Sequence, residues 1–272
     1  RQRLEFEDRL GLYERLDAHS MVVWMSFLMG DLAGADRESA DMVSRLLPGQ
    51  APYPALHLYA WRTITLHFLG RWDEAASMFW RDFEVWNEAG SHAAIYALRG
   101  FICGIDLGRA RGDGRIEMAA QQAITSVLSR VAPTSGLQRL HDYMKGESAF
   151  TTGEWLGAYP AEMVERRLNL ANDCRQAVPD NVIEETMNRA VRYKIPLLEA
   201  QTRRTIALGR KDAQEMSNAI AIWERIGAVP LIGRAKAERG LITGEEAETE
   251  SGLQILSKLG DAFYLDRFSH QI

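Results

Sequence analysis

The stretch Gly70-Arg-Trp72-Asp-Glu-Ala75-Ala-Ser-Met-Phe79 decides the fold, because a glycine turn leads directly into a helix that opens on alanine. The same pattern, G-x-W-x-x-A, returns at Gly153-Glu-Trp155-Leu-Gly-Ala158. A looser copy runs from Gly34 to Ala40. Recurrence of one turn-and-helix unit predicts a protein built from helical repeats.

The spacing of the alanines gives the length of the repeating unit. Ala40 and Ala75 are 35 residues apart, and Ala213 and Ala247 are 34 residues apart. A helix pair of about 34 residues cannot bury its own apolar face and must stack on copies of itself. The period therefore predicts a curved stack of helix pairs.

The helix after Gly70 shows how such a pair would pack. Its apolar residues recur at helical spacing and form one stripe: Ala76, Phe79, Phe83 and Trp86. Three charged residues are expected to turn away from that stripe: Arg81, Asp82 and Glu84. The preceding segment, about 55–69, is apolar on more than one side, which predicts a helix sandwiched between neighbours.

Glycine and proline turn signals divide the chain into helices from end to end. Helix pairs are expected at roughly 14–47, 54–89, 91–131 and 136–176, an extra helix near 181–193, and further pairs at 197–227 and 229–259. Residues 261–268 would form a short capping segment. We expect one domain over 1–272, with the more regular pairs at 14–89 and 197–259 and an irregular middle at 112–196.

Charge and cysteine usage narrow the class of protein. A formal net charge of -5 argues against direct nucleic-acid binding. The basic clusters, such as Arg203-Arg204 with Arg210-Lys211, are expected to be solvated helix faces or to complement helix C-termini. Cys103 and Cys174 lie 71 residues apart, which excludes C-x-x-C chemistry and predicts two small buried residues in a cytoplasmic protein.

The most apolar run, Met21–Met29, is nine residues long, whereas a membrane-spanning helix needs about 20. We interpret it as a core helix segment and expect no membrane partner. The chain begins at Arg1 rather than at a methionine, so a piece of a longer polypeptide is expected.

The turn-and-helix unit resembles the tetratricopeptide repeat, whose marks are a small turn residue, an aromatic, an alanine and a second aromatic. Gly70, Trp72, Ala75 and Phe79 match all four marks, and the copy at 153–158 matches three, with Glu162 at the fourth. The resemblance implies an all-α, right-handed superhelix of about 12 or 13 helices.

The C-terminal third carries a second resemblance. The segments AIAIWERIGA (219–228) and ILSKLGDA (255–262) are similar to the tail of large bacterial regulators, either adenylate-cyclase-like or LuxR/maltose-regulator-like. In those proteins a catalytic or DNA-binding head and an ATPase precede a helical-repeat region. The resemblance implies that this chain is the sensing or coupling arm of a signalling regulator.

One inner helix carries the candidate binding residues. His57, Trp61, Ile64 and His67 recur on one helix face, which in the family that the chain resembles lines the concave groove. An aromatic ring between two imidazoles could grip a side chain or carboxylate of a peptide. The alternative is that Trp61 is a core residue and that both histidines are satisfied core or surface residues.

Catalytic, metal and cofactor sites are not expected. Positions 57 and 67 would lie about 15 Å apart along a helix, too far for one metal ion. Adjacent acids such as Glu184-Glu185 point to different sides of a helix. The sequence contains no phosphate-binding G-x-x-x-x-G-K-[ST] motif, and no set of nucleophile, base and orienting group can be assembled.

Two functions are therefore in competition. The first is a non-catalytic scaffold that binds a protein or peptide, or other domains of the same polypeptide, through a concave surface. The second is a sensor of a small molecule, bound in a pocket in the irregular middle at 112–196. Self-association through uncapped repeat ends is a further possibility.

Overall fold

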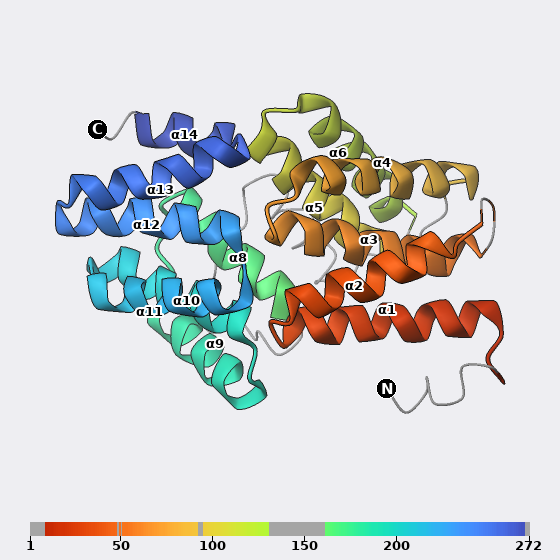
Figure 1. The fold of residues 1–272 in the computed structure, drawn as a ribbon, viewed down its shortest axis with the longest axis horizontal. Helices are drawn as coiled ribbons and strands as arrows, with labels where there is room; N and C mark the ends of the chain where they lie inside the picture. Colours follow the sequence, from red (N-terminus) through yellow and green to blue (C-terminus); the bar gives the residue numbers. More distant parts are fainter. Residues whose placement is uncertain (1–8, 48, 50, 92–94, 131–160, 270–272) are drawn as a thin grey trace. The chain divides into compact units, whose positions relative to one another are not determined.

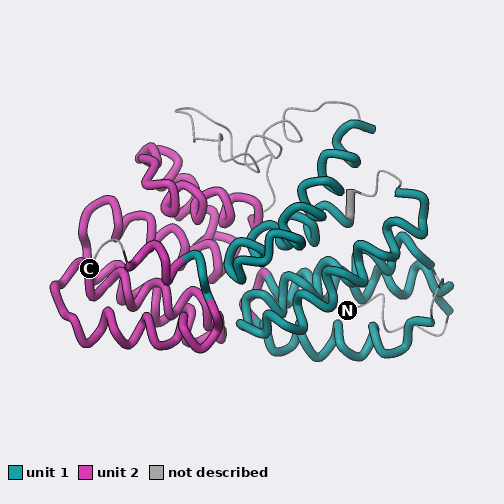
Figure 2. The backbone as a smooth tube through the Cα atoms, turned by 90° about the horizontal axis from the view of Figure 1, so that it is seen from above, with its two compact units in different colours: residues 1–27, 31–132, 261–263 teal, residues 28–30, 133–260, 264–272 magenta. Residues whose placement is uncertain are grey.

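The computed structural model describes residues 9–47, 49, 51–91, 95–130 and 161–269. Thirteen helices and no strand occur among these residues, which confirms the all-α prediction. The chain's contacts divide it into two compact units, coloured separately in Figure 2. We predicted one domain with a right-handed superhelical course; both remain predictions, and each unit is described by itself.

Unit 1 comprises 1–27, 31–132 and 261–263. Its helices, labelled in Figure 1, are α1 (Leu12–Leu28, whose last residue belongs to unit 2), α2 (Leu32–Ser44), α3 (Pro52–Phe68), α4 (Trp72–Glu88), α5 (Ile95–Arg111) and α6 (Gly114–Leu128). These bounds confirm the expected pairs within a few residues.

Helix α3 lies at the centre of unit 1. It packs against α2, α4 and α5, and every residue from Ala55 to Phe68 is buried. A helix in contact with three neighbours has no face left for solvent, which explains why the segment is apolar on several sides. The expectation of a sandwiched helix is confirmed.

The turn between α3 and α4 shows why the opening motif forms a tight pair. Gly70 has φ +76°, a left-handed conformation that glycine adopts without steric cost. Trp72 is buried and its Nε1 donates to the carbonyl of His67 at 3.0 Å, so the indole fastens the start of α4 to the end of α3. Ala75 and Phe79 are fully buried behind it.

The prediction that Asp82 lies on a solvated face of α4 is wrong. Its carboxylate is fully buried. It lies where α4 meets α5, and a Cβ on Gly100 would stand 2.5 Å from its Oδ2. Neither of its oxygens has a hydrogen-bond partner among the described residues, and burial raises the pKa of Asp82 well above its usual range. Helix α4 packs on both α3 and α5, so its buried face is wider than the single apolar stripe predicted from sequence. Asp82 lies on this wider face and is therefore buried.

The prediction that the run Met21–Met29 is a core segment is only partly right. It forms a helix as predicted, but Met21, Met25 and Met29 are 37%, 49% and 52% exposed. Val23 and Phe27, between them in the sequence, are buried. One face of the run therefore lies in the core, and the methionines lie on the surface.

Unit 2 comprises 28–30, 133–260 and 264–272. Its described helices are α8 (Ala161–Asp173), α9 (Asp180–Tyr193), α10 (Pro196–Arg210), α11 (Ala213–Ile226), α12 (Val229–Thr243), α13 (Glu246–Leu259) and most of α14 (Ala262–Ser269). The extra helix predicted near 181–193 is confirmed as α9. The first half of the pair predicted at 136–176, with the motif at 153–158, lies outside the described residues.

Close packing of α12 against α13 depends on small residues. A Cβ on Gly252 would stand 2.3 Å from the backbone nitrogen of Ala237 and 2.6 Å from the carbonyl oxygen of Gly233. Only glycine fits where two backbones approach this closely. Tyr264 and Phe268 of α14 then pack on Ala237, which confirms the expected capping segment.

The prediction that Cys174 is buried is wrong. This residue follows α8 and is exposed, whereas Cys103 in α5 is buried as expected. The apolar residues that precede Cys174 belong to the core face of α8, and the cysteine lies just beyond the end of that helix.

Candidate functional site

The four predicted groove residues all lie on α3. Their side chains are inside unit 1: Trp61 is 0%, Ile64 2%, His57 4% and His67 8% exposed. His67 stacks on Trp72 with ring centroids 5.9 Å apart. This packing agrees with the alternative of core residues, and the partner-binding role stays a prediction.

His57 and Trp61 form a buried pair. The indole Nε1 of Trp61 donates to Nε2 of His57 at 3.0 Å. Trp24 stacks on Trp61 at 6.0 Å, and the guanidinium of Arg99 lies 5.5 Å from the Trp61 ring. Burial, reinforced by the positive charge of Arg99, lowers the pKa of His57 to about 4. The imidazole is therefore neutral at pH 7 and accepts the indole hydrogen.

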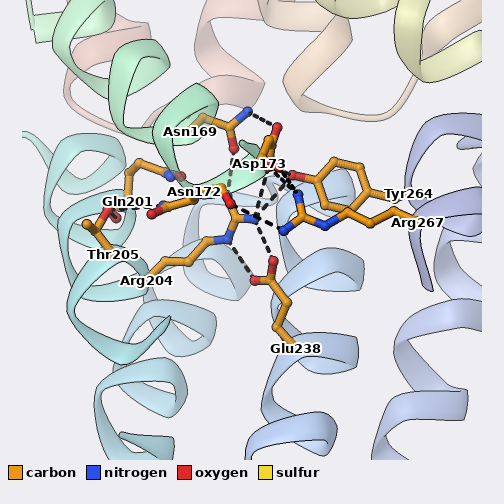
Figure 3. A network of polar contacts seen from close by, with 9 residues as sticks. All are labelled: Asn169, Asn172, Asp173, Gln201, Arg204, Thr205, Glu238, Tyr264 and Arg267. Carbon is orange, nitrogen blue, oxygen red and sulfur yellow. Dashed lines mark hydrogen bonds and ion pairs between the residues drawn. The ribbon is translucent and has the colours of Figure 1, made fainter. Parts of the chain in front are cut away.

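Unit 2 contains a network of nine polar and charged residues centred on Arg204 (Figure 3). Arg204 was expected on a solvated helix face, yet it is fully buried on α10. Its Nε and Nη2 donate to the two carboxylate oxygens of Glu238 on α12, at 2.7 and 2.6 Å. Its Nη1 donates to Oδ1 of Asn169 on α8 at 2.7 Å. Burial alone would lower the pKa of Arg204, but Glu238 raises it well above its ordinary value.

Helix α14 closes the same network from the other side. The hydroxyl of Tyr264 accepts from Nη2 of Arg204 at 3.1 Å and donates to the carboxylate of Asp173. Arg267 donates to the carbonyl oxygens of Asp173 at 2.9 Å and Asn172 at 3.2 Å, at the C-terminus of α8. Burial raises the pKa of Tyr264 well above its ordinary value, so the hydroxyl keeps its proton.

The network joins four helices of unit 2, namely α8, α10, α12 and α14, through charged and polar side chains (Figure 3). A buried charge is tolerated only when it is paired and its remaining hydrogen-bonding groups are satisfied. Arg204 meets this condition, with partners for Nε, Nη1 and Nη2. The arrangement fixes the relative positions of these helices and is structural in character.

A cavity of about 750 Å³ opens beside this network. Four network residues form part of its wall: Asn172, Thr205, Glu238 and Arg267. The wall also contains apolar residues: Ala177, Val178, Ile183, Ile206, Leu208, Leu241, Ile242 and Phe268. Ligand sites of proteins are typically clefts of about 300–1,000 Å³ with apolar walls and a few placed polar groups.

The cavity contains more basic than acidic side chains. Its basic residues are Arg175, Arg210, Lys211 and Arg267, and its acidic residues are Asp180 and Glu238. Arg210 approaches Asp180 at 3.4 Å, and Glu238 is held by Arg204 behind the wall. The cavity lining therefore has a net positive charge, although the net charge of the whole chain is -5.

Two of these basic residues have unusual backbone conformations. Arg175, just after α8, and Lys211, just after α10, both have φ +53°. The left-handed region costs a residue with a side chain about 1–2 kcal/mol, and glycine is the common choice there. Gly227, Gly244 and Gly260 end the helices α11, α12 and α13 in this way.

Other predicted features have structural roles. Asp113 of the Gly112-Asp-Gly114 turn caps α6, accepting the backbone N–H of Arg115 at 3.0 Å. Among the described residues, no group of three or more His, Cys, Asp or Glu could hold a metal ion. None of the described helices combines the length and the apolar character needed to cross a membrane.

Comparison of the chain with protein-family models, with curated proteins and with solved structures gave no match. The likeness to tetratricopeptide repeats and to bacterial regulators therefore remains an expectation from sequence. The cavity and its charges are the basis for assigning a function.

Proposed function

We propose that the protein is a non-catalytic, small-molecule-binding helical module whose ligand occupies the cavity of unit 2. The observation that carries this proposal is the cavity itself, which has the volume, the apolar wall and the few polar groups of a ligand site. Its lining begins in the irregular middle, at Asn172–Ile183, where sequence analysis placed a sensor pocket, and extends onto α10, α12 and α14.

The rigidity of one wall supports the same proposal. The side chain of Asn172 donates to Oγ1 of Thr205 at 3.1 Å, and that hydroxyl donates to the carbonyl of Gln201 at 3.0 Å. Glu238 is fixed by Arg204. Polar groups that are already held in position lose little entropy when a ligand arrives, so the site is pre-organised.

A thermal-shift screen of a metabolite library tests the proposal. We expect one chemical class to raise the melting temperature by several degrees, because a ligand that binds only the folded state stabilises it by mass action. Ile206→Trp, which fills part of the cavity, should abolish the shift. Val191→Trp, at an exposed position of α9 away from the cavity, is the matched control and should keep it.

Equal shifts in both tryptophan variants would place the ligand elsewhere and overturn the proposal. If Ile206→Trp melts well below Val191→Trp without ligand, Ile206→Ala gives the second test. Enlarging the cavity should weaken the binding of the same compound, and unchanged binding would again count against the site.

A second candidate function, protein or peptide binding, is favoured by the surface of α1. Tyr13, Met21 and Met25 recur at spacings of eight and four residues and are 37–53% exposed. Flexible methionines are frequent on surfaces that accept varied peptides. A peptide-array signal lost in Met21→Gln/Met25→Gln would support this candidate, whereas a signal unchanged in that variant would remove α1 from it.

A further inference from the structure

We infer that the ligand of the unit 2 cavity is an organic anion with an apolar body. This inference rests on the proposed function, because it names the chemical class that the same cavity would bind. Two features of the wall carry it: an excess of basic over acidic side chains, and aliphatic surface.

The positive charge is concentrated on two side chains. Arg210 has Asp180 as an ion-pair partner at 3.4 Å, and Arg267 has Asp173 at 3.4 Å. Arg175 and Lys211 line the same cavity, and neither side chain forms an ion pair or hydrogen bond with the described part of the chain. Both residues are exposed, so their charges can attract an anion that enters the cavity.

The acidic residues of the wall do not cancel this charge. Both carboxylate oxygens of Glu238 accept from Arg204, at 2.7 and 2.6 Å, so this acid is neutralised from behind the wall. Asp180 faces Arg210. The charge left for a ligand is therefore that of Arg175 and Lys211, which favours an anionic group.

A structural explanation competes with this inference. Arg175 and Lys211 follow the C-termini of α8 and α10, where a cation complements the helix dipole. Lys194 follows α9 in the same way, also with φ +53°, and does not line the cavity. Lys194 thus shares the backbone conformation and the dipole role of Lys211 but not its position, which makes it a matched control.

The apolar body of the ligand follows from the rest of the wall. Val178, Ile183, Ile206 and Leu241 come from three helices and the segment before α9, and all four line the cavity. A small inorganic anion would leave this surface in contact with water. An anion with an aromatic or alkyl body buries it and gains the hydrophobic contribution as well.

Two fluorescent probes that differ by one charged group test the inference. Anilinonaphthalene sulfonate is an organic anion with an aromatic body, and N-phenylnaphthylamine is its neutral counterpart. We expect the sulfonate to bind the wild-type protein at least about tenfold more tightly, which corresponds to about 1.4 kcal/mol. Added salt should weaken the binding of the sulfonate and leave the neutral probe unchanged.

Variants then assign the charge preference to the cavity. Arg175→Gln/Lys211→Gln should raise the Kd of the sulfonate about tenfold and change the Kd of the neutral probe less than twofold. Lys194→Gln should change neither. Ile206→Trp should weaken both probes, since it occupies the space of the apolar body.

The outcomes separate the two proposals. If the neutral probe binds as tightly as the sulfonate and Ile206→Trp weakens both, the cavity is a ligand site but the anionic class is wrong. If the sulfonate binds and neither Ile206→Trp nor the double variant affects it, the anion lies elsewhere and both proposals are wrong. Equal losses in Lys194→Gln and in the double variant would show a general charge effect and overturn the assignment of Arg175 and Lys211.

Discussion

Arg204 and Glu238 stand 34 positions apart in the sequence and form a two-pronged ion pair inside unit 2, at 2.7 and 2.6 Å. Asn169, which accepts from the same guanidinium, lies 35 positions before Arg204. The spacing equals the repeat length found in the sequence. Equivalent positions of successive helix pairs thus meet in space and place three polar side chains in contact.

Removing the charge of Arg204 should destabilise unit 2 strongly. Arg204→Met would leave the carboxylate of Glu238 buried without its partner, which typically costs about 3–5 kcal/mol. Chemical denaturation of wild type and variant measures this loss. Arg203→Met is the control, because Arg203 pairs with Glu199 and Glu215 near the surface and should contribute at most about 1 kcal/mol.

Combining Arg204→Met with Glu238→Leu should recover part of the loss, since both charges are then gone. A double variant as unstable as the sum of its single variants would mean that the pair does not act as a unit. An Arg204→Met protein with wild-type stability would contradict the burial of the network.

Tyr264→Phe should cost about 1–3 kcal/mol at pH 7, because it deletes a hydroxyl that joins Arg204 to Asp173. Because the pKa of Tyr264 is raised in the folded state, the stability of the wild-type protein should fall at alkaline pH. The contribution of Tyr264 is complete below the pKa of an unfolded tyrosine, about 10, and is lost as the pH rises above it. Denaturation between pH 8 and 11 should therefore show the two proteins converging. A constant difference over that range would contradict the prediction.

Asp82→Asn should stabilise unit 1 at pH 7. The folded-state pKa of Asp82 is raised, so stability falls as the pH rises from the unfolded value of about 3.9. The gain at pH 7 should be about 1–3 kcal/mol and should vanish near pH 4. Glu88→Gln, an exposed position of the same helix, should change stability little at either pH. Parallel pH profiles of wild type and Asp82→Asn would show that the carboxylate is not buried.

His57→Gln tests a pH dependence of stability that is opposite in sign to that of Asp82. The folded-state pKa of His57 is about 4, below its ordinary value of 6.5, so its contribution is lost as the pH falls from 6.5 toward 4. At about 1.36 kcal/mol per pH unit, the loss amounts to about 3 kcal/mol. The glutamine retains an acceptor for the indole of Trp61. The difference between the two denaturation profiles should carry this slope, whereas an NMR titration of His57 with a midpoint near 6.5 would refute its burial.

Two glycine substitutions should have opposite signs. Gly252→Ala should destabilise the protein, because the new methyl would meet the α12 backbone at 2.3 Å. Gly209→Ala, in α10 with nothing within 4 Å of the added carbon, should stabilise it by about 0.5–1 kcal/mol through helix propensity. Melting temperatures of the two variants provide the check. A stabilised Gly252→Ala would mean that α12 and α13 pack less closely than described.

The fold could be read from sequence to a large extent because local signals and the repeat period agree. Gly70, Trp72 and Ala75 each do in the structure what the motif requires of them: a left-handed turn, a buried anchor and a close contact. The helix ends fell within a few residues of the turn signals. The two compact units were not foreseen, since similar helices continue through both.

The candidate site was harder to predict because its residues gain their roles only through packing. Arg203 and Arg204 are identical in type and adjacent, yet the first lies near the surface and the second is buried among acids. The signal that could have found the pair was the 34-residue period, which relates Arg204 to Glu238. No local pattern marks Arg175 or Lys211, because a non-glycine residue in a left-handed turn looks ordinary in sequence.

NMR of isoleucine methyl groups during titration with whichever of the two naphthalene probes binds more tightly tests the central claim most directly. Isoleucines of the cavity wall should shift progressively with the probe: Ile183, Ile206 and Ile242. Isoleucines in the interior of unit 1 should stay in place: Ile64, Ile102 and Ile124. Shifts confined to unit 1, or probe binding that leaves all three cavity isoleucines unmoved, would contradict the assignment of the unit 2 cavity as the ligand site.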